Sequence, residues 1–210
     1  MSMMTKRDYT SWVIIAILIV IIVALIYRQQ DGTASEPPSG MLAPNDPSIV
    51  LIDAPQIYTL GQYTLKTLAT FSATARVLNV RHYYDDREAE LSTVDFALGW
   101  GRMSDSAVLR SYEITQSNRW YFWHRGDNPP VSDDYVITHS RNVHIISSSK
   151  DVAKIVNEVI KNNVIQVSGY LVAVTANDGY HWISYLSLQG EGAHTCLVLL
   201  VTDITINSKG

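Results

Sequence analysis

An unbroken apolar segment near the N-terminus constrains this chain more than any other feature. From Trp12 to Tyr27 the sequence WVIIAILIVIIVALIY contains no charged and no strongly polar side chain. As a helix rising 1.5 Å per residue, the segment spans about 24 Å, and with its flanks it can just cross a hydrocarbon core of roughly 30 Å. We therefore predict a transmembrane helix over residues 11–28, with the lipid bilayer as its partner.

Two other structures are possible for this segment. A cleaved signal peptide has a shorter apolar core of about 7–15 residues and a small-residue cleavage site, whereas Leu25, Ile26 and Tyr27 follow here. A buried helix of a soluble domain needs one polar face, and this segment is apolar all round. The pattern favours an uncleaved anchor.

The charges around the anchor predict its orientation. Lys6 and Arg7 precede it, and Arg28 is followed by acidic residues. The positive-inside rule then places residues 1–10 in the cytoplasm as a short tail and the C-terminal domain outside it. In a Gram-negative cell this is an inner-membrane protein with a periplasmic domain.

The remainder of the chain is acidic and holds one cysteine. Beyond the N-terminal tail there are 14 basic and 19 acidic residues without a basic run, which argues against nucleic acid as a partner. Cys196 excludes an intrachain disulfide, and the apolar residues after it suggest a buried strand in which the thiol acts as a small hydrophobe.

Composition changes twice after the anchor. Residues 29–48 hold four of the seven prolines and predict an extended, semi-rigid spacer. Residues 49–210 are rich in Val, Ile, Thr and Tyr between Gly, Asn and Asp, which predicts a β-rich domain. Its expected strands cover residues 69–77, 112–116, 120–124, 135–139, 143–146, 165–174, 180–186 and 195–206. Asn177, Asp178 and Gly179 predict a tight turn.

One main helix is expected. In SSSKDVAKIVNEVIKNN, residues 147–163, apolar side chains recur at intervals of three and four, a serine can cap the start, and Asn162 or Asn163 can end it. A shorter helical turn is expected at Ser104–Arg110. The fold class is therefore mainly β, a β-rich α+β arrangement resembling a small barrel of the OB type with an extra hairpin. Gly169 falls where a curled sheet needs room.

Two neighbouring segments concentrate aromatic and arginine side chains: SNRWYFWHRGDNPP, residues 117–130, and DFALGWGRMSDS, residues 95–106. They could form an aromatic platform for a sugar or another flat ligand. The structural alternative is that the rings fill a core, which is the commoner use of aromatic side chains. The candidate ligand-binding residues are Trp100, Arg102, Arg119, Trp120 and His144.

Four sequence stretches resemble landmarks of a group of uncharacterised bacterial single-pass membrane-anchored proteins. They are LGWGRMSD, QSNRWYFW, SRNVHII and a run in which GYLV is followed by Trp182 and Cys196. The resemblance covers residues 63–201 and implies this architecture without an assigned activity. The chain departs from that pattern at Ser147, where proline is expected, and at Leu197, where an acidic residue is expected. Any role that the acidic residue has in that group is absent at Leu197 of this chain.

Catalytic and metal-binding patterns are weak. Cys196 and His194 would share one strand face, but no nucleophile motif surrounds them, so the catalytic residues are unknown. The histidines lack HxH or HExxH spacing, so we expect no metal ligands and no cofactor. The tripeptide Arg125–Asp127 predicts a turn rather than an adhesion motif.

These observations favour an interaction module over an enzyme. The predicted function is a membrane-anchored extracytoplasmic domain that binds another envelope protein or a wall component. The alternative is a small-molecule, metal-binding or enzymatic domain that uses the aromatic and arginine surface. The alternative requires Arg102 and Arg119 to be accessible in a pocket, whereas structural arginines should be paired internally.

Overall fold

The computed structural model describes Trp12 and residues 14–21, 33–190 and 195–208. The chain divides into two units, Met1–Gly32 and Thr33–Gly210. In the first, Trp12 and residues 14–21 are helical with exposed apolar side chains. Within these described ranges, no helix is both long and apolar enough to span a membrane. The other positions of the predicted anchor, and the predicted tail 1–10, lie outside the described residues.

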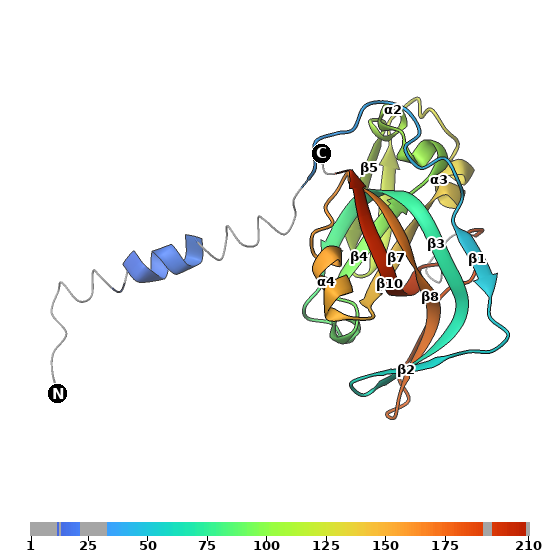
Figure 1. The fold of residues 1–210 in the computed structure, drawn as a ribbon. Coiled ribbons are helices and arrows are strands. Elements are labelled where there is room, and N and C mark those ends of the chain that lie inside the picture. The colour runs from blue at the N-terminus through green and yellow to red at the C-terminus, as the bar shows by residue number, and fades with distance from the viewer. Residues whose placement is uncertain (1–11, 13, 22–32, 191–194, 209–210) are drawn as a thin grey trace. The chain divides into compact units, whose positions relative to one another are not determined.

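The second unit is mainly β, as predicted (Figure 1). Its strands are β1 (Ser48–Leu51), β2 (Ile57–Leu60), β3 (Tyr63–His82), β4 (Val94–Gly99), β5 (Tyr112–Ser117), β6 (Trp120–Arg125), β7 (Ser140–Ser147), β8 (Val164–Ala176), β9 (His181–Ile183) and β10 (Leu197–Ser208). Its helices are η1 (Arg87–Glu90), η2 (Gly101–Ser104), α2 (Ser106–Leu109), α3 (Asp133–His139) and α4 (Lys150–Val156).

The main sheet closes on itself. One edge of β3 pairs with β2, β1 and β4, and its other edge pairs with β8. β4 then pairs with β7, β7 with β10 in parallel, and β10 with β8. Because β3 joins both ends of this series, β3, β4, β7, β10 and β8 form a ring (Figure 1). The short strand β9 pairs with the end of β8.

The strand β3 encloses the core because its sequence alternates and its pairing is irregular. Phe71, Ala73 and Ala75 are buried while the side chains between them face outward or are partly covered, as the alternation predicts. Register shifts interrupt its pairing with both β4 and β8, which lets a long strand bend. At Gly169 on β8 a Cβ atom would overlap the Leu200 carbonyl oxygen, so the predicted need for glycine is confirmed.

The helix α4 covers part of the core but is shorter than predicted. Ser149 Oγ accepts from the Val152 N–H at its start, and Val152 and Val156 are buried. The helix ends at Val156 rather than at Asn162. The chain after it is held in a turn by a bond from the Ile160 N–H to Asn163 Oδ1.

The prediction of a strand at residues 135–139 is wrong. These residues belong to α3, because Ser132 Oγ accepts from the Tyr135 N–H and two aspartates stand in the first helical turn. The aromatic rings of Tyr135 and His139 stack one turn apart, with centroids 3.7 Å apart. The strand predicted at residues 180–186 is confirmed only for the three residues of β9.

The predicted spacer, residues 29–48, differs from expectation from Thr33 onward. These residues are largely irregular but lie along the domain instead of standing apart from it. The Ala34 N–H donates to the Lys161 carbonyl at 2.9 Å, and the Ala43 N–H donates to Ser104 Oγ at 3.0 Å. Ala43 is fully buried. Proline-rich composition predicted an irregular chain, but these long-range bonds decide where it lies.

Candidate functional sites

The aromatic stretch forms β6 of a separate two-stranded hairpin, β5 and β6. Tyr121 and Trp123 pack against the buried residues of β5, whereas Trp120 and Phe122 are 42% and 44% exposed. The predicted alternation of rings between two faces is confirmed. One face of the hairpin therefore belongs to a core, and the other offers two aromatic rings to solvent.

Arg119 lies in the hairpin turn and binds two carboxylates. Its backbone has a φ of 66°, in the left-handed region. Its Nη1 donates to Asp95 Oδ1 at 2.8 Å, and its Nε and Nη2 donate to Asp86 at 2.8 and 2.7 Å. The guanidinium group also lies over the ring of Tyr83, 3.9 Å from its centroid. These contacts join the hairpin to β4 of the main sheet and to the segment between β3 and β4.

His144 binds the same carboxylate from the next strand. Asp95 on β4 and His144 on β7 are register partners, and both are buried. Asp95 Oδ1 lies 2.9 Å from His144 Nδ1, but no aligned hydrogen bond forms at that nitrogen, so the attraction is that of an ion pair. The centroid of the His144 ring also lies 4.9 Å from the centroid of the Trp182 ring.

The charges in this group perturb one another. Burial lowers the pKa of His144, but the Asp95 carboxylate and a hydrogen bond with Cys196 outweigh it and raise the pKa to about 9. Hydrogen bonds from Arg119 lower the pKa of Asp86. Burial raises the pKa of Tyr83 to about 12. Two cations and two carboxylates thus neutralise each other, which is the arrangement of an internal structural cluster.

Trp100 and Arg102 do not belong to this charged cluster. Trp100 is 1% exposed, as expected of a core residue. A Cβ at Gly99 would meet the Met103 carbonyl oxygen at 2.5 Å, and Gly101 has a φ of 54°, so both positions require glycine because of these backbone constraints. Arg102 is exposed and lines none of the described cavities.

The five predicted ligand-binding residues therefore do not form one surface. Trp100 belongs to a core, and Arg119 and His144 are used internally. Arg102 is exposed, so the condition that both arginines be paired internally is met only by Arg119. Trp120 alone lines a cavity, of about 140 Å³, together with Asn142 and Cys196. This volume is below the roughly 300–1,000 Å³ usual for ligand pockets.

Cys196 is only partly buried, in contrast to the expected buried strand position, and it precedes the first residue of β10. The Sγ atom is 3.9 Å from Asn142 Nδ2. His194 lies outside the described residues, and the histidine that interacts with the thiol is His144. Sequence reasoning missed the pairing of Asp95 with His144, although an ionisable residue in each of two apolar strands was a usable signal. In the part of the chain that the structure describes, no group of three His, Cys, Asp or Glu side chains could hold a metal.

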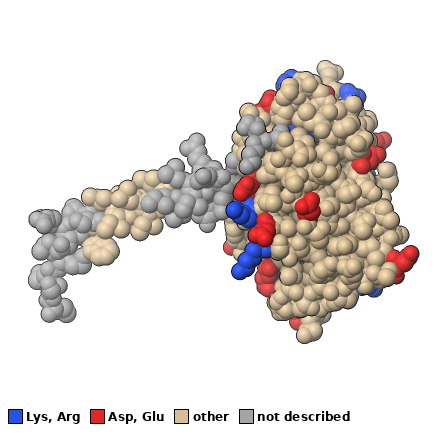
Figure 2. Space-filling model, in the orientation of Figure 1, with Lys and Arg blue, Asp and Glu red and all other residues tan. Residues whose placement is uncertain are grey.

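A separate surface lies at β1. This strand pairs with β3 and with no other described strand, so its second edge is open. Val50 and Leu51 are 58% and 67% exposed, and Ile57 on β2 is 60% exposed. The face turned to the viewer, with β3, β8 and β10 in front, carries few charged side chains (Figure 2).

Comparisons with family models, curated proteins and solved structures find no match to this chain. The proposed landmark LGWGRMSD covers the junction of β4 and η2, and QSNRWYFW covers the tip and second strand of the hairpin. Their assignment to a bacterial protein group stays a prediction.

Proposed function

We propose that this protein is a membrane-tethered interaction module whose domain lies outside the cytoplasm and binds another envelope protein. The observation that carries the proposal is the open edge of β1. A free strand edge presents unpaired backbone N–H and C=O groups, which proteins usually protect by a very short strand, charges, proline or a bulge. The strand β1, SIVL, is four residues long and follows Pro47, but it contains no charge, proline or bulge itself.

The side chains of β1 agree with a protein partner. Val50 and Leu51 are both more than half exposed. A partner that adds a strand to this edge would satisfy the backbone groups and cover these side chains. Burial of a leucine side chain stabilises a complex by about 1.5–3 kcal/mol, so the gain from the pair is substantial.

The proposal includes the architecture of the domain and its tether. The ring order β3, β4, β7, β10, β8, with a parallel pair β7 and β10 and with α4 between β7 and β8, supports an OB-type barrel. The apolar segment at residues 11–28 supports the anchor. Retention of the full-length chain in membranes after carbonate extraction tests the tether, since release without detergent contradicts it.

A second candidate function is a binding platform for a wall component at the exposed rings of Trp120 and Phe122. Their exposure favours it, because two neighbouring rings on one face of a hairpin can stack on a flat apolar surface. The residues predicted to accompany Trp120 do not support it, since Arg119 is bound to carboxylates. We therefore rank the β1 edge first.

The experiment is site-specific crosslinking of the full-length protein in native membranes. A photoreactive residue at Val50 is expected to give a discrete adduct that Leu51→Lys abolishes, because a lysine at an open edge opposes strand addition. Ile183→Lys is the matched control: Ile183 is 60% exposed on β9, which pairs with β8 and not with β1. Equal adduct in both variants would refute the β1 surface. Loss in Trp120→Ser alone would favour the aromatic platform.

A further inference from the structure

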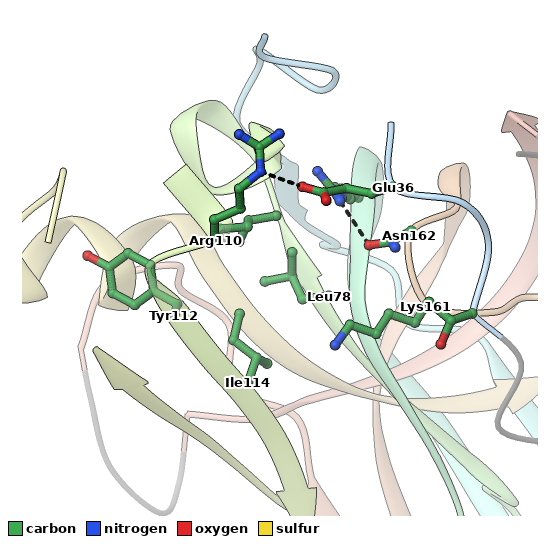
Figure 3. A pocket seen from close by; sticks show the side chains of 10 residues that line it. Glu36, Leu78, Arg110, Tyr112, Ile114, Lys161 and Asn162 are labelled. Carbon is green, nitrogen blue, oxygen red and sulfur yellow. Dashed lines mark hydrogen bonds and ion pairs between the residues drawn. The ribbon is translucent and has the colours of Figure 1, made fainter. Parts of the chain in front are cut away.

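A second cavity, of about 310 Å³, lies on a different part of the domain. Its walls come from the start of the described second unit, from β3, from the segment joining α2 to β5, and from the turn before β8 (Figure 3). Its charged lining residues are Glu36, Arg76, Arg110 and Lys161, and its large apolar or aromatic ones include Leu78, Tyr112 and Ile114. None of them is part of the β1 edge.

The lining carries more positive than negative charge. Arg110 Nε donates to Glu36 Oε1 at 3.1 Å, so this pair is neutral. Arg76 and Lys161 also line the cavity, and neither has an ion pair with a carboxylate of the described residues. The cavity therefore has an excess of two positive charges in a chain whose net charge is −4.

Arg76 is the unusual member because it is 2% exposed. Its Nη1 donates to Ser106 Oγ at 2.7 Å and its Nη2 donates to Asn162 Oδ1 at 2.8 Å, both neutral acceptors. Its Nε has no hydrogen-bond partner among the described residues. Burial lowers the pKa of Arg76. Buried guanidinium groups are ordinarily paired with an anion, whereas none of the acceptors that hydrogen-bond to Arg76 is a carboxylate.

One wall of the cavity is largely apolar. Leu78, Tyr112 and Ile114 form one side, and the Lys161 side chain points into the cavity toward them (Figure 3). A ligand that satisfies both halves has an anionic group at Arg76 and Lys161 and an apolar part against these side chains. The volume is at the lower end of the range for ligand pockets, about 300–1,000 Å³, which limits the ligand to a small molecule.

We propose that this cavity binds a small organic anion, whose carboxylate or phosphate group contacts Arg76 and Lys161 and whose apolar body packs on Leu78, Tyr112 and Ile114. Charge-assisted hydrogen bonds to a planar guanidinium group suit both anionic groups. The Glu36 carboxylate opposes the ligand by its charge, although its pairing with Arg110 reduces this effect. The site is independent of the proposed protein partner.

The test is calorimetric titration of the full-length protein in non-ionic detergent with phenyl phosphate, benzoate and neutral benzyl alcohol. We expect saturable binding of at least one anion and much weaker binding of benzyl alcohol. The two anions distinguish a phosphate site from a carboxylate site. Absence of binding by both anions, or equal binding of the neutral probe, overturns the proposal.

Two variants of opposite charge effect sharpen the test. Lys161→Gln removes one charge-assisted contact and should weaken anion binding by about tenfold or more. Glu36→Gln removes the opposing carboxylate and should tighten it. Lys154→Gln, at an exposed position of α4, is the charge-matched control and should leave binding unchanged. Equal weakening by both lysine variants would show that only net charge matters and would refute the site.

Discussion

The ion pair between Asp95 and His144 should make the stability of the folded domain depend on pH in the weakly alkaline range. The pKa of His144 is raised from its ordinary 6.5 to about 9 in the folded protein. One unit of pKa corresponds to 1.36 kcal/mol, so protonation of His144 contributes about 3 kcal/mol to the free energy of unfolding.

The sign of the effect follows from the direction of the shift. A group whose folded pKa is raised stabilises the protein fully below its unfolded pKa and loses that contribution as pH rises through the folded value. Stability from His144 should therefore be complete below pH 6.5, fall between pH 6.5 and 9, and be absent above pH 9. Neutral His144 would leave the buried Asp95 carboxylate with Arg119 as its remaining cation.

The assay is urea unfolding of the full-length protein in non-ionic detergent at pH 6, 7.5 and 9, followed by tryptophan fluorescence. His144→Gln is the comparison, because it should remove most of the pH-dependent difference while other titrating groups remain. Nuclear magnetic resonance titration of the imidazole gives the pKa directly. A His144 pKa near 6.5, or the same pH dependence in His144→Gln, would refute the reasoning.

Three further outcomes are expected. Arg119→Met removes one of the cations paired with the buried Asp95 carboxylate and should lower the free energy of unfolding in urea by about 3–5 kcal/mol. Arg125→Met breaks a surface ion pair with Asp133 and should lower it by at most about 1 kcal/mol. Similar costs for the two variants would contradict the buried cluster. Gly169→Ala places a Cβ on a backbone oxygen of the neighbouring strand and should cost about 3 kcal/mol, seen as a lower Tm. An unchanged Tm would contradict the close approach of β8 and β10 at this position. Trp123 packs against a buried cluster, so Trp123→Ser should destabilise the domain by about 3 kcal/mol in the same assay. Trp120 is exposed, so Trp120→Ser should cost less than about 1 kcal/mol. The reverse order would show that the other face of the hairpin packs on the core.

Strands with clear alternation were predictable from the sequence. The buried set on β3 and the two faces of β6 follow from residue type and the period of two. The segment at residues 135–139 was not, because its β-branched residues resemble a strand and the decisive signal is the Ser132 cap. Local capping overrode side-chain propensity there.

The candidate sites were less predictable than the strands. The sequence identified Arg119, Trp120 and His144 as unusual, but it grouped them as one ligand surface. The structure separates them because Arg119 and His144 share Asp95, a residue distant from both in the chain. The cavity at Arg76 and Lys161 has no sequence signature, since its lining comes from four separated segments.

Residue types and their period determined that the domain is mainly β and that alternate rings of β6 face apart. These properties depend on neighbours in the chain. Tertiary structure decided that β3 closes the ring through β8, that residues 33–47 lie along the domain and which charges meet at Asp95. These properties depend on pairings between distant segments, whose energies depend on the folded geometry rather than on local sequence.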